Sequence, residues 1–417
     1  MVRDFIPRAI TGRILEALSD TPVVVLNGPR QSGKTTLVRS LPYAGRAEVL
    51  TLDDVATRQA AGYDPRAFLD RPVDTLVVDE AQLEPALFRA IKAEVDRDRR
   101  SGRFLLTGSS RLLAAPGMAD ALVGRVEALE LWPIAERELT RAYTPTFIDA
   151  AFAAPGALLR NGTLLREDVI DRLLRGGFPE AASRSPSRRR AWYDSYVKTT
   201  VQGVVAELAA LERLAEIPRL LQLCAARSGM ELNASAVASD LGIPARTISG
   251  YLARLETAFL LRLVPAWSTN LSAKVVRRPK LFISDAGLAA HLQGATIGSL
   301  TRSGPAAIGP LLETLVATEL LRQLSWADTP ATLGHFRDRS GVEVDLVLQH
   351  PDGRIVGVEI KATSTPRAED LRGLRFLADR LGERFAYGCV LSLAREATPF
   401  GKQFASLPIS SLWDPIS

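Results

Sequence analysis

Short apolar runs alternate with stretches of helical periodicity over the first third of the chain. Runs of this length that are rich in valine and leucine predict strands, and the stretches between them predict the crossover helices of a parallel sheet. The predicted strands are residues 23–26, 49–52, 75–78, 104–107 and 126–131. Residues 1–140 are therefore expected to form one doubly wound α/β domain.

After residue 132 the strand pattern fades, and two further patterns follow. The pattern predicts mostly helix over residues 135–228, and shorter helices interrupted by a turn over residues 231–267. The pattern of residues 308–413 predicts a helix, three strands, a helix and a strand. We expect three parts after the first domain: a helical linker region, a winged-helix domain and a second α/β domain, at residues 141–228, 229–300 and 301–417.

The composition agrees with a multidomain globular protein. Of 417 residues, 47% are hydrophobic and 24% are charged, which is close to the average for such proteins. The two cysteines exclude a disulfide framework and a cysteine-rich metal site. No apolar run is long enough to cross a membrane, and the charged N-terminus does not fit a secretory signal. We therefore predict a cytoplasmic protein with no membrane partner.

The kind of basic residue is more informative than the net charge. A net charge of +5, from 52 basic and 47 acidic residues, is too small to prove a nucleic-acid partner. Only seven of the basic residues are lysine, so a position that keeps lysine is a candidate for needing a compact ammonium group. Lys34 and Lys361 both stand within motifs described below.

A glycine-containing loop follows the first predicted strand and precedes a predicted helix at residues 35–41. It matches the pattern GxxxxGK[ST] at every fixed position. Such a loop turns its backbone N–H groups toward a β-phosphate, and the helix N-terminus adds its dipole. Lys34 would reach the β- and γ-phosphates, and the Thr35 hydroxyl would bind Mg²⁺. The predicted ATP-binding residues are Gly28, Pro29, Arg30, Gln31, Ser32, Gly33, Lys34, Thr35 and Thr36.

Further polar residues follow the later strands, at the edge where open α/β sheets bind ligands. Asp79 would hold Mg²⁺, and Glu80 would polarise the attacking water. Ser109 either senses the γ-phosphate, holds that water, or caps the next helix. Arg111 and Arg125 are candidates for an arginine that reaches a phosphate, which could belong to a neighbouring subunit. The alternative is that they form surface ion pairs.

These motifs together resemble a known family. The phosphate loop, the runs Val-Val-Asp-Glu-Ala-Gln at 77–82 and Leu-Thr-Gly-Ser-Ser at 106–110, and the Gly-Arg pair at 124–125 resemble the AAA-type P-loop ATPases of bacteria and archaea. They are most similar to the group whose C-terminal half is a domain of unknown function. The resemblance covers nearly the whole chain and implies binding of ATP and ADP, hydrolysis with Mg²⁺ and a homo-oligomer.

Residues 232–252 have the spacing of a helix-turn-helix, with Gly242 at the turn. The second predicted helix, residues 245–257, would turn Ile248, Leu252 and Leu255 inward. Its outward residues would be Arg246, Thr247, Ser249 and Gly250. The segments 259–264 and 274–280 would supply a wing. A winged helix of this kind contacts either DNA or a protein.

The last part of the chain places acids and a lysine on neighbouring elements. Glu313 lies on a predicted helix, Asp345 on a strand, and Glu359 and Lys361 share one face of the next strand. Acids that converge from two strands can bind a divalent cation, and a nearby lysine can position the attacking water.

The order of these elements resembles the core of the PD-(D/E)xK nuclease superfamily. The resemblance implies that Asp345 and Glu359 are metal ligands, that Lys361 is the catalytic lysine and that Glu313 is an accessory acid. Glu343 would be a spare carboxylate on the face of Asp345.

Two functions fit these patterns. The first is an ATP hydrolase that acts on DNA or is gated by it, with a metal-dependent nuclease-like domain. The second is a nucleotide-operated regulatory or scaffold protein whose C-terminal domain binds a partner or nucleic acid without cleaving it. Metal-dependent cleavage that is lost in Asp345→Ala would separate them.

Overall fold

The structure is a computed structural model that describes residues 5–112, 122–207, 216–268, 277–302 and 304–416. The chain divides into two compact units. The first unit comprises Met1–Ile134 and Thr257–Phe259, and the second comprises Ala135–Glu256 and Leu260–Ser417. The three parts predicted after residue 140 thus belong to one unit, except for Thr257–Phe259, which belong to the first unit.

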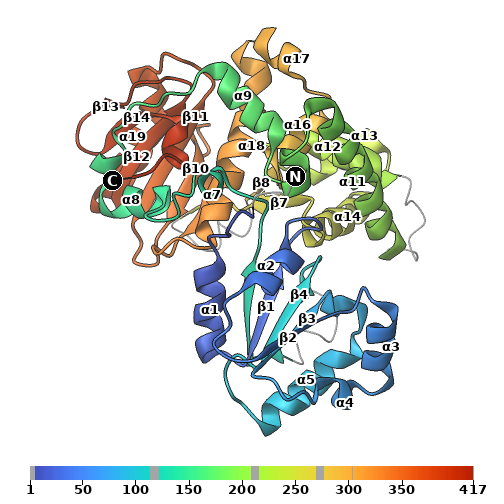
Figure 1. Ribbon diagram of the computed structural model, residues 1–417. Coiled ribbons are helices and arrows are strands. Elements are labelled where there is room, and N and C mark those ends of the chain that lie inside the picture. Colours follow the sequence, from blue (N-terminus) through green and yellow to red (C-terminus); the bar gives the residue numbers. More distant parts are fainter. Residues whose placement is uncertain (1–4, 113–121, 208–215, 269–276, 303, 417) are drawn as a thin grey trace. The chain divides into compact units, whose positions relative to one another are not determined.

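The first unit contains a parallel five-stranded sheet in the order β2-β3-β4-β1-β5 (Figure 1). The strands are β1 (Val23–Asn27), β2 (Ala47–Thr51), β3 (Thr75–Asp79), β4 (Phe104–Gly108) and β5 (Val126–Glu130). All five predicted strands are confirmed, with ends that differ by no more than two residues. The predicted α/β fold with a parallel sheet is therefore confirmed for this unit.

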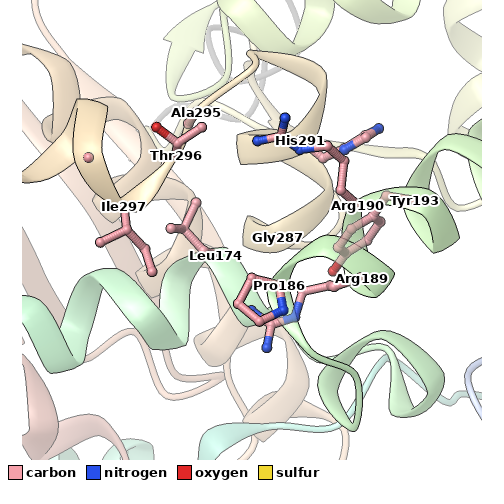
Figure 2. Close-up of a pocket in the computed structure, with 11 residues that line it drawn as sticks. Leu174, Pro186, Arg189, Arg190, Tyr193, Gly287, His291, Ala295, Thr296 and Ile297 are labelled. Atoms are coloured by element: carbon pink, nitrogen blue, oxygen red, sulfur yellow. The ribbon is translucent and has the colours of Figure 1, made fainter.

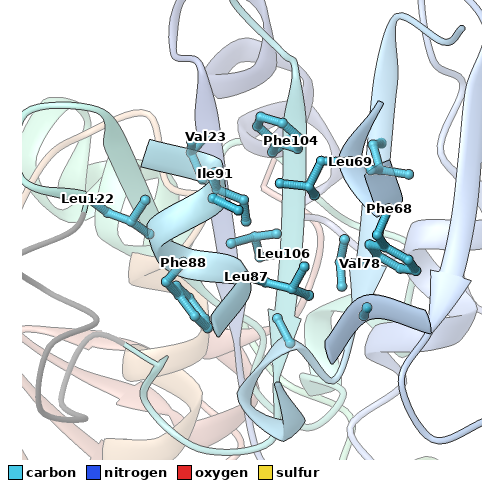
Figure 3. Packing of buried hydrophobic residues seen from close by; sticks show 14 of the residues in the cluster. Val23, Phe68, Leu69, Val78, Leu87, Phe88, Ile91, Phe104, Leu106 and Leu122 are labelled. Carbon is cyan, nitrogen blue, oxygen red and sulfur yellow. The ribbon is translucent and has the colours of Figure 1, made fainter. Parts of the chain in front are cut away.

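Helices cover both faces of this sheet because its strands are apolar on both sides. One core contains Val24 and Leu26 of β1, packed against residues of α1 (Thr11–Asp20) and α2 (Lys34–Ser40). The opposite core contains Val23 and Val25, packed against the helices α3, α4 and α5 (Figure 3). These helices span Val55–Tyr63, Pro65–Leu69 and Ala86–Arg97.

The second unit begins with helices, as predicted. They are α7 (Glu136–Leu139), α8 (Phe147–Ala153), α9 (Arg166–Arg175), α10 (Pro179–Ala182), α11 (Pro186–Glu207) and α12 (Ile217–Ala226). A small antiparallel sheet follows, in the order β6-β8-β7, with β6 (Met230–Glu231), β7 (Leu261–Val264) and β8 (Lys280–Ile283). The helices α13 (Ala234–Leu241) and α14 (Ala245–Thr257) lie between β6 and β7 in the chain.

The chain then forms α16 (Ala286–Leu292), α17 (Ile297–Arg302) and α18 (Pro305–Leu324), followed by a six-stranded mixed sheet in the order β13-β14-β12-β11-β10-β9. Its elements are β9 (Thr332–Arg337), β10 (Glu343–Gln349), β11 (Ile355–Lys361), α19 (Arg372–Leu381), β12 (Phe385–Ser392), β13 (Thr398–Pro399) and β14 (Phe404–Pro408). The predicted order of helix, three strands, helix and strand is confirmed, and the last two strands were not predicted.

Leu374 and Leu377 of α19 pack on one face of this sheet, against Val344 and Val347 of β10. None of the described helices combines the length and apolar character needed to cross a bilayer.

Candidate functional site

The phosphate loop joins β1 to α2, and its glycines have specific structural reasons. A Cβ atom on Gly28 would lie 2.2 Å from the carbonyl oxygen of Leu131, so that only glycine fits there. Gly33 has a φ of +96°, which L side chains rarely adopt. The loop can therefore bring its backbone close to a bound phosphate.

The Lys34 side chain is buried inside this loop. Its Nζ atom donates to the carbonyl oxygens of Gly28, at 2.9 Å, and Pro29, at 3.1 Å. It lies 3.9 Å from Oε1 of Glu80. Burial lowers the pKa of Lys34, although the carboxylates of Glu80 and Asp79 oppose this shift. A buried ammonium within a loop of backbone N–H groups fits the phosphates of a nucleotide.

Asp79 stands at the end of β3 and contacts two threonines. Its Oδ2 atom accepts a hydrogen bond from the Thr35 hydroxyl at 2.8 Å, and its Oδ1 atom accepts one from the Thr107 hydroxyl at 2.5 Å. The hydroxyl and carboxylate oxygens are the kind of ligand that Mg²⁺ prefers. The predicted pair of Thr35 and Asp79 is thus brought together, and Thr107 is a contact that the sequence motifs did not indicate.

Glu80 follows Asp79 in the left-handed backbone conformation, with a φ of 57°. The Gln82 amide donates hydrogen bonds to the Glu80 carboxylate and, at 3.0 Å, to the hydroxyl of Ser109. Gln82 therefore joins the predicted base to the predicted sensor. Residues 113–121, over which the predicted helix after Ser109 would continue, lie outside the described residues.

Two residues outside the motifs also belong to this region. The Arg8 guanidinium donates to the carbonyl oxygens of Ser32, at 2.9 Å, and Trp132, at 2.7 Å. It thereby connects the phosphate loop to the chain that follows β5. Asp53 follows β2, and burial raises its pKa, with a further contribution from Glu80 and Asp79. Neither residue stands in a recognisable pattern of the sequence.

The two candidate arginines lie at opposite ends of the strands of the sheet. Arg111 follows β4 at the loop's edge, where its Nε atom lies 3.2 Å from Oε1 of Glu130. Arg125 precedes β5, and its carbonyl oxygen accepts the N–H of Val23 at the start of β1. A five-residue strand separates that position from the phosphate loop, roughly 15 Å. Because its side chain pairs with Asp96, Arg125 does not reach the loop of its own chain.

In the second unit, Glu359 and Lys361 share one face of β11, as predicted, and their Oε1 and Nζ atoms lie 2.7 Å apart. Both line a polar cavity of about 290 Å³. Burial, and then the charge of Asp345, raise the pKa of Glu359 to about 8. Within the described residues, the Oε2 atom of Glu359 has no hydrogen-bond partner.

Glu313 and Asp345 meet at a different group, the ammonium of Lys280. Its Nζ atom lies 2.8 Å from Oε1 of Glu343, 3.1 Å from Oδ1 of Asp345 and 3.5 Å from Oε2 of Glu313. Among the described residues, no three carboxylate, histidine or cysteine side chains are arranged to bind a metal ion. The assignment of Glu313, Asp345 and Glu359 as metal ligands stays a prediction.

The helix α14 has the faces that its pattern predicted. Ile248, Leu252 and Leu255 are buried, whereas Arg246 and Ser249 are exposed. The strands β7 and β8 pair antiparallel, residues 274–276 of the predicted wing lie outside the described residues, and the winged helix stays a prediction.

A further cavity of about 250 Å³ lies among α9, α11, α16 and α17 (Figure 2). Arg189 and Arg190, from an arginine run on α11, line it together with Tyr193 and His291. The His291 ring stacks on Tyr193, and burial lowers the pKa of His291. The histidine carried no signal in the sequence because no partner stands at a ligand spacing from it.

Comparison with family models assigns the class of the first unit. Residues 20–140 match a model described as an AAA domain, and two models of domains of unknown function, DUF8612 and DUF4143, match residues 166–297 and 308–412. The loop, the parallel sheet and this match identify the first unit as an AAA-type P-loop domain. The predicted resemblance is confirmed to that extent, including a C-terminal domain of unknown function.

The chain belongs to the family of two mycobacterial proteins, the uncharacterized proteins Rv2008c of Mycobacterium tuberculosis and Mb2031c of Mycobacterium bovis. It is 31% identical to each over 363 residues, which cover 86% of this chain and 74% of each relative.

Two solved structures also have detectable similarity. A Walker-type ATPase of Pyrococcus abyssi is 14% identical with a TM-score of 0.41, over 70% of this chain and 97% of that one. A RuvB variant of Thermotoga maritima is 20% identical with a TM-score of 0.27, over 60% of this chain and 86% of that one.

Proposed function

We propose that the N-terminal unit hydrolyses ATP at the edge of the sheet where β1 and β3 end. The observation that carries this proposal is the contact of Thr35 with Asp79 beside the buried Lys34. Thr35 and Asp79 would hold Mg²⁺, which when bound neutralises charge on the phosphates. Lys34 would bind the β- and γ-phosphates.

Glu80 is the proposed base that takes a proton from the attacking water. The hydrogen bond from Gln82 fixes one oxygen of its carboxylate and leaves the orientation of the group defined before substrate binds. The same amide bonds to Ser109, so that a change at Ser109 on nucleotide binding would reach Glu80 through one side chain. Ser109 is therefore the proposed sensor of the γ-phosphate.

We further propose a homo-oligomer in which Arg125 serves the nucleotide of a neighbouring copy. Arg125→Ala alone should lose most ATPase activity, and mixing it with Lys34→Ala should restore part of it, because some interfaces then combine an intact loop with an intact arginine. The measurement is the ATPase rate of each protein and of the mixture, with co-assembly checked by size. Mixed oligomers that show no recovered activity would argue for the ion pair with Asp96 as its only role.

DNA is the proposed partner. The exposed Arg246 on α14 and the exposed Arg190 beside the cavity of Figure 2 support this proposal, because arginines of this kind contact phosphates. We expect DNA to raise the ATPase rate severalfold at low salt and less at high salt. The test compares rates without DNA, with single-stranded DNA and with double-stranded DNA. Equal rates in all three at low salt would contradict the DNA role.

The second candidate function is that of a scaffold whose C-terminal domain binds without cleaving. The contacts of Lys280 favour it, because an ammonium group rests on Asp345 where the nuclease-like resemblance requires a metal ion. The donor set as it stands does not fit a divalent cation, and we derive no cleavage step from it. DNA cleavage that needs Mg²⁺ and disappears in Asp345→Ala would decide against this candidate.

A further inference from the structure

Lys280 lies in a setting that differs from that of any surface lysine. It begins β8, where its backbone is paired with Glu231 of β6 and Val264 of β7, and its side chain is 2% exposed. Two neighbouring strands thus fix the position from which the ammonium group reaches the acids of α18 and β10. The group is held there by the sheet and not by a mobile loop.

The number of hydrogen-bond donors on the Lys280 ammonium group equals the number of carboxylates around it. Lysine has three N–H donors, and three carboxylates surround this one. Burial alone would lower the pKa of Lys280, but Asp345, Glu313 and Glu343 together raise it. Arginine supplies almost all positive charge elsewhere in this chain, whereas lysine can donate to three acids from one compact nitrogen.

Both oxygens of Asp345 accept hydrogen bonds within the protein. Its Oδ1 atom accepts from Lys280, and its Oδ2 atom accepts the backbone N–H of Ile360 at 2.9 Å. The pairing of β10 with β9 shifts in register between Val344 and Val347, the stretch that contains Asp345, and such an irregularity redirects side chains within a strand. Glu359, the other acid that the nuclease-like resemblance assigns to a metal, is paired with Lys361.

We propose that Lys280 is the resident cation of the C-terminal acidic site, in the place of a divalent metal ion, and that Asp345 binds no metal while Lys280 is present. Acids this close together require a positive charge, and the chain provides it from β8. This inference rests on the nuclease-like reading of the C-terminal domain and deepens the second candidate function. The contact between Lys280 of β8 and Asp345 of β10 would then have two effects. It would join the middle and C-terminal parts of the second unit, and it would keep a metal ion from Asp345.

The test is the response of the melting temperature to Mn²⁺ in nucleotide-free protein that carries Asp79→Asn, so that the ATP site does not contribute. With Lys280 in place, Mn²⁺ should leave the melting temperature unchanged. Lys280→Met should melt at a lower temperature without metal and should gain roughly 5 °C at a saturating Mn²⁺ concentration. Lys402→Met, at an exposed position, is the matched control and should behave like the parent protein.

Two results with folded protein would overturn the inference. One is a Mn²⁺-dependent rise with Lys280 in place that is lost on Asp345→Asn. The other is a folded Lys280→Met protein that gains nothing from Mn²⁺. If Lys280→Met does not fold in EDTA, recovery of folded protein by refolding in Mn²⁺ supports the inference, and failure to refold in both conditions contradicts it.

The proposed DNA role is tested separately, by fluorescence anisotropy of labelled DNA in EDTA. Lack of binding there would count against the DNA role alone, since the Mn²⁺ response does not depend on DNA.

Discussion

Lys34→Ala is expected to abolish ATP binding, whereas Glu80→Gln should retain binding and lose turnover roughly 10²- to 10⁴-fold. The Lys34 ammonium is buried within the loop and already directed at the carbonyl oxygens of Gly28 and Pro29, so its removal takes away the charge that the phosphates would meet. An amide at position 80 keeps the size of the side chain but cannot accept a proton from water. Binding of a fluorescent ATP analogue and the steady-state ATPase rate measure the two effects.

Lys92→Ala is the control for the first substitution, because Lys92 is exposed on α5. Its binding and turnover should equal those of the unchanged protein. A Glu80→Gln protein that hydrolyses ATP at the normal rate would move the role of base to another residue, and Asp53, whose pKa is raised by burial, is the next carboxylate to test.

The candidate ATP site could be predicted from the sequence because its chemistry is local. Lys34 and Thr35 are fixed by the spacing of one loop, and Asp79 and Glu80 follow a strand whose apolar run is unambiguous. Parallel strands end at a common edge, so the position of each acid follows from the strand that precedes it. The structure agrees with this reasoning in the contact between Thr35 and Asp79.

The contacts that orient these groups were not predictable in the same way. Arg8 reaches Trp132 over 124 positions, and Gln82 reaches Ser109 over 27, so neither pair forms a pattern along the chain. The sheet order that places β4 between β1 and β3 brings Thr107 to Asp79. Such contacts depend on tertiary packing, on which hydrophobic periodicity carries no information.

The partners of Lys280 were likewise not predictable from the sequence. Its identity was visible as one of seven lysines, but its partners lie 33, 63 and 65 positions further along the chain, on two other elements. The acids alone predicted a need for positive charge. Whether that charge is an ion or a side chain is decided by the packing of β8 against α18 and β10.

A second large effect is expected in the buried ionic network of the second unit. Arg322 donates to Oε1 of Glu319 at 2.7 Å and to Oδ2 of Asp285 at 2.8 Å, and both acids are fully buried. Asp285 also accepts the hydroxyl of Tyr193 at 3.1 Å and the N–H of Gly177 at 2.7 Å. The network therefore ties α18 to α16 and to the chain between α9 and α10.

Arg322→Met should lower the free energy of unfolding by about 3–5 kcal/mol, because it leaves two buried carboxylates without their cation. The melting temperature of the second unit should fall by roughly 10 °C. Arg380→Met, on the exposed face of α19, is the control and should change neither quantity. Burial raises the pKa of Glu319 to about 7. Replacing Glu319 by a neutral residue should therefore lower the free energy of unfolding less than replacing Arg322. The double variant Arg322→Met, Glu319→Gln should thus recover part of the lost free energy of unfolding. Its stability can still be measured if the single variant does not fold. A single variant within 1 kcal/mol of the unchanged protein in urea unfolding would show that the network contributes little to stability.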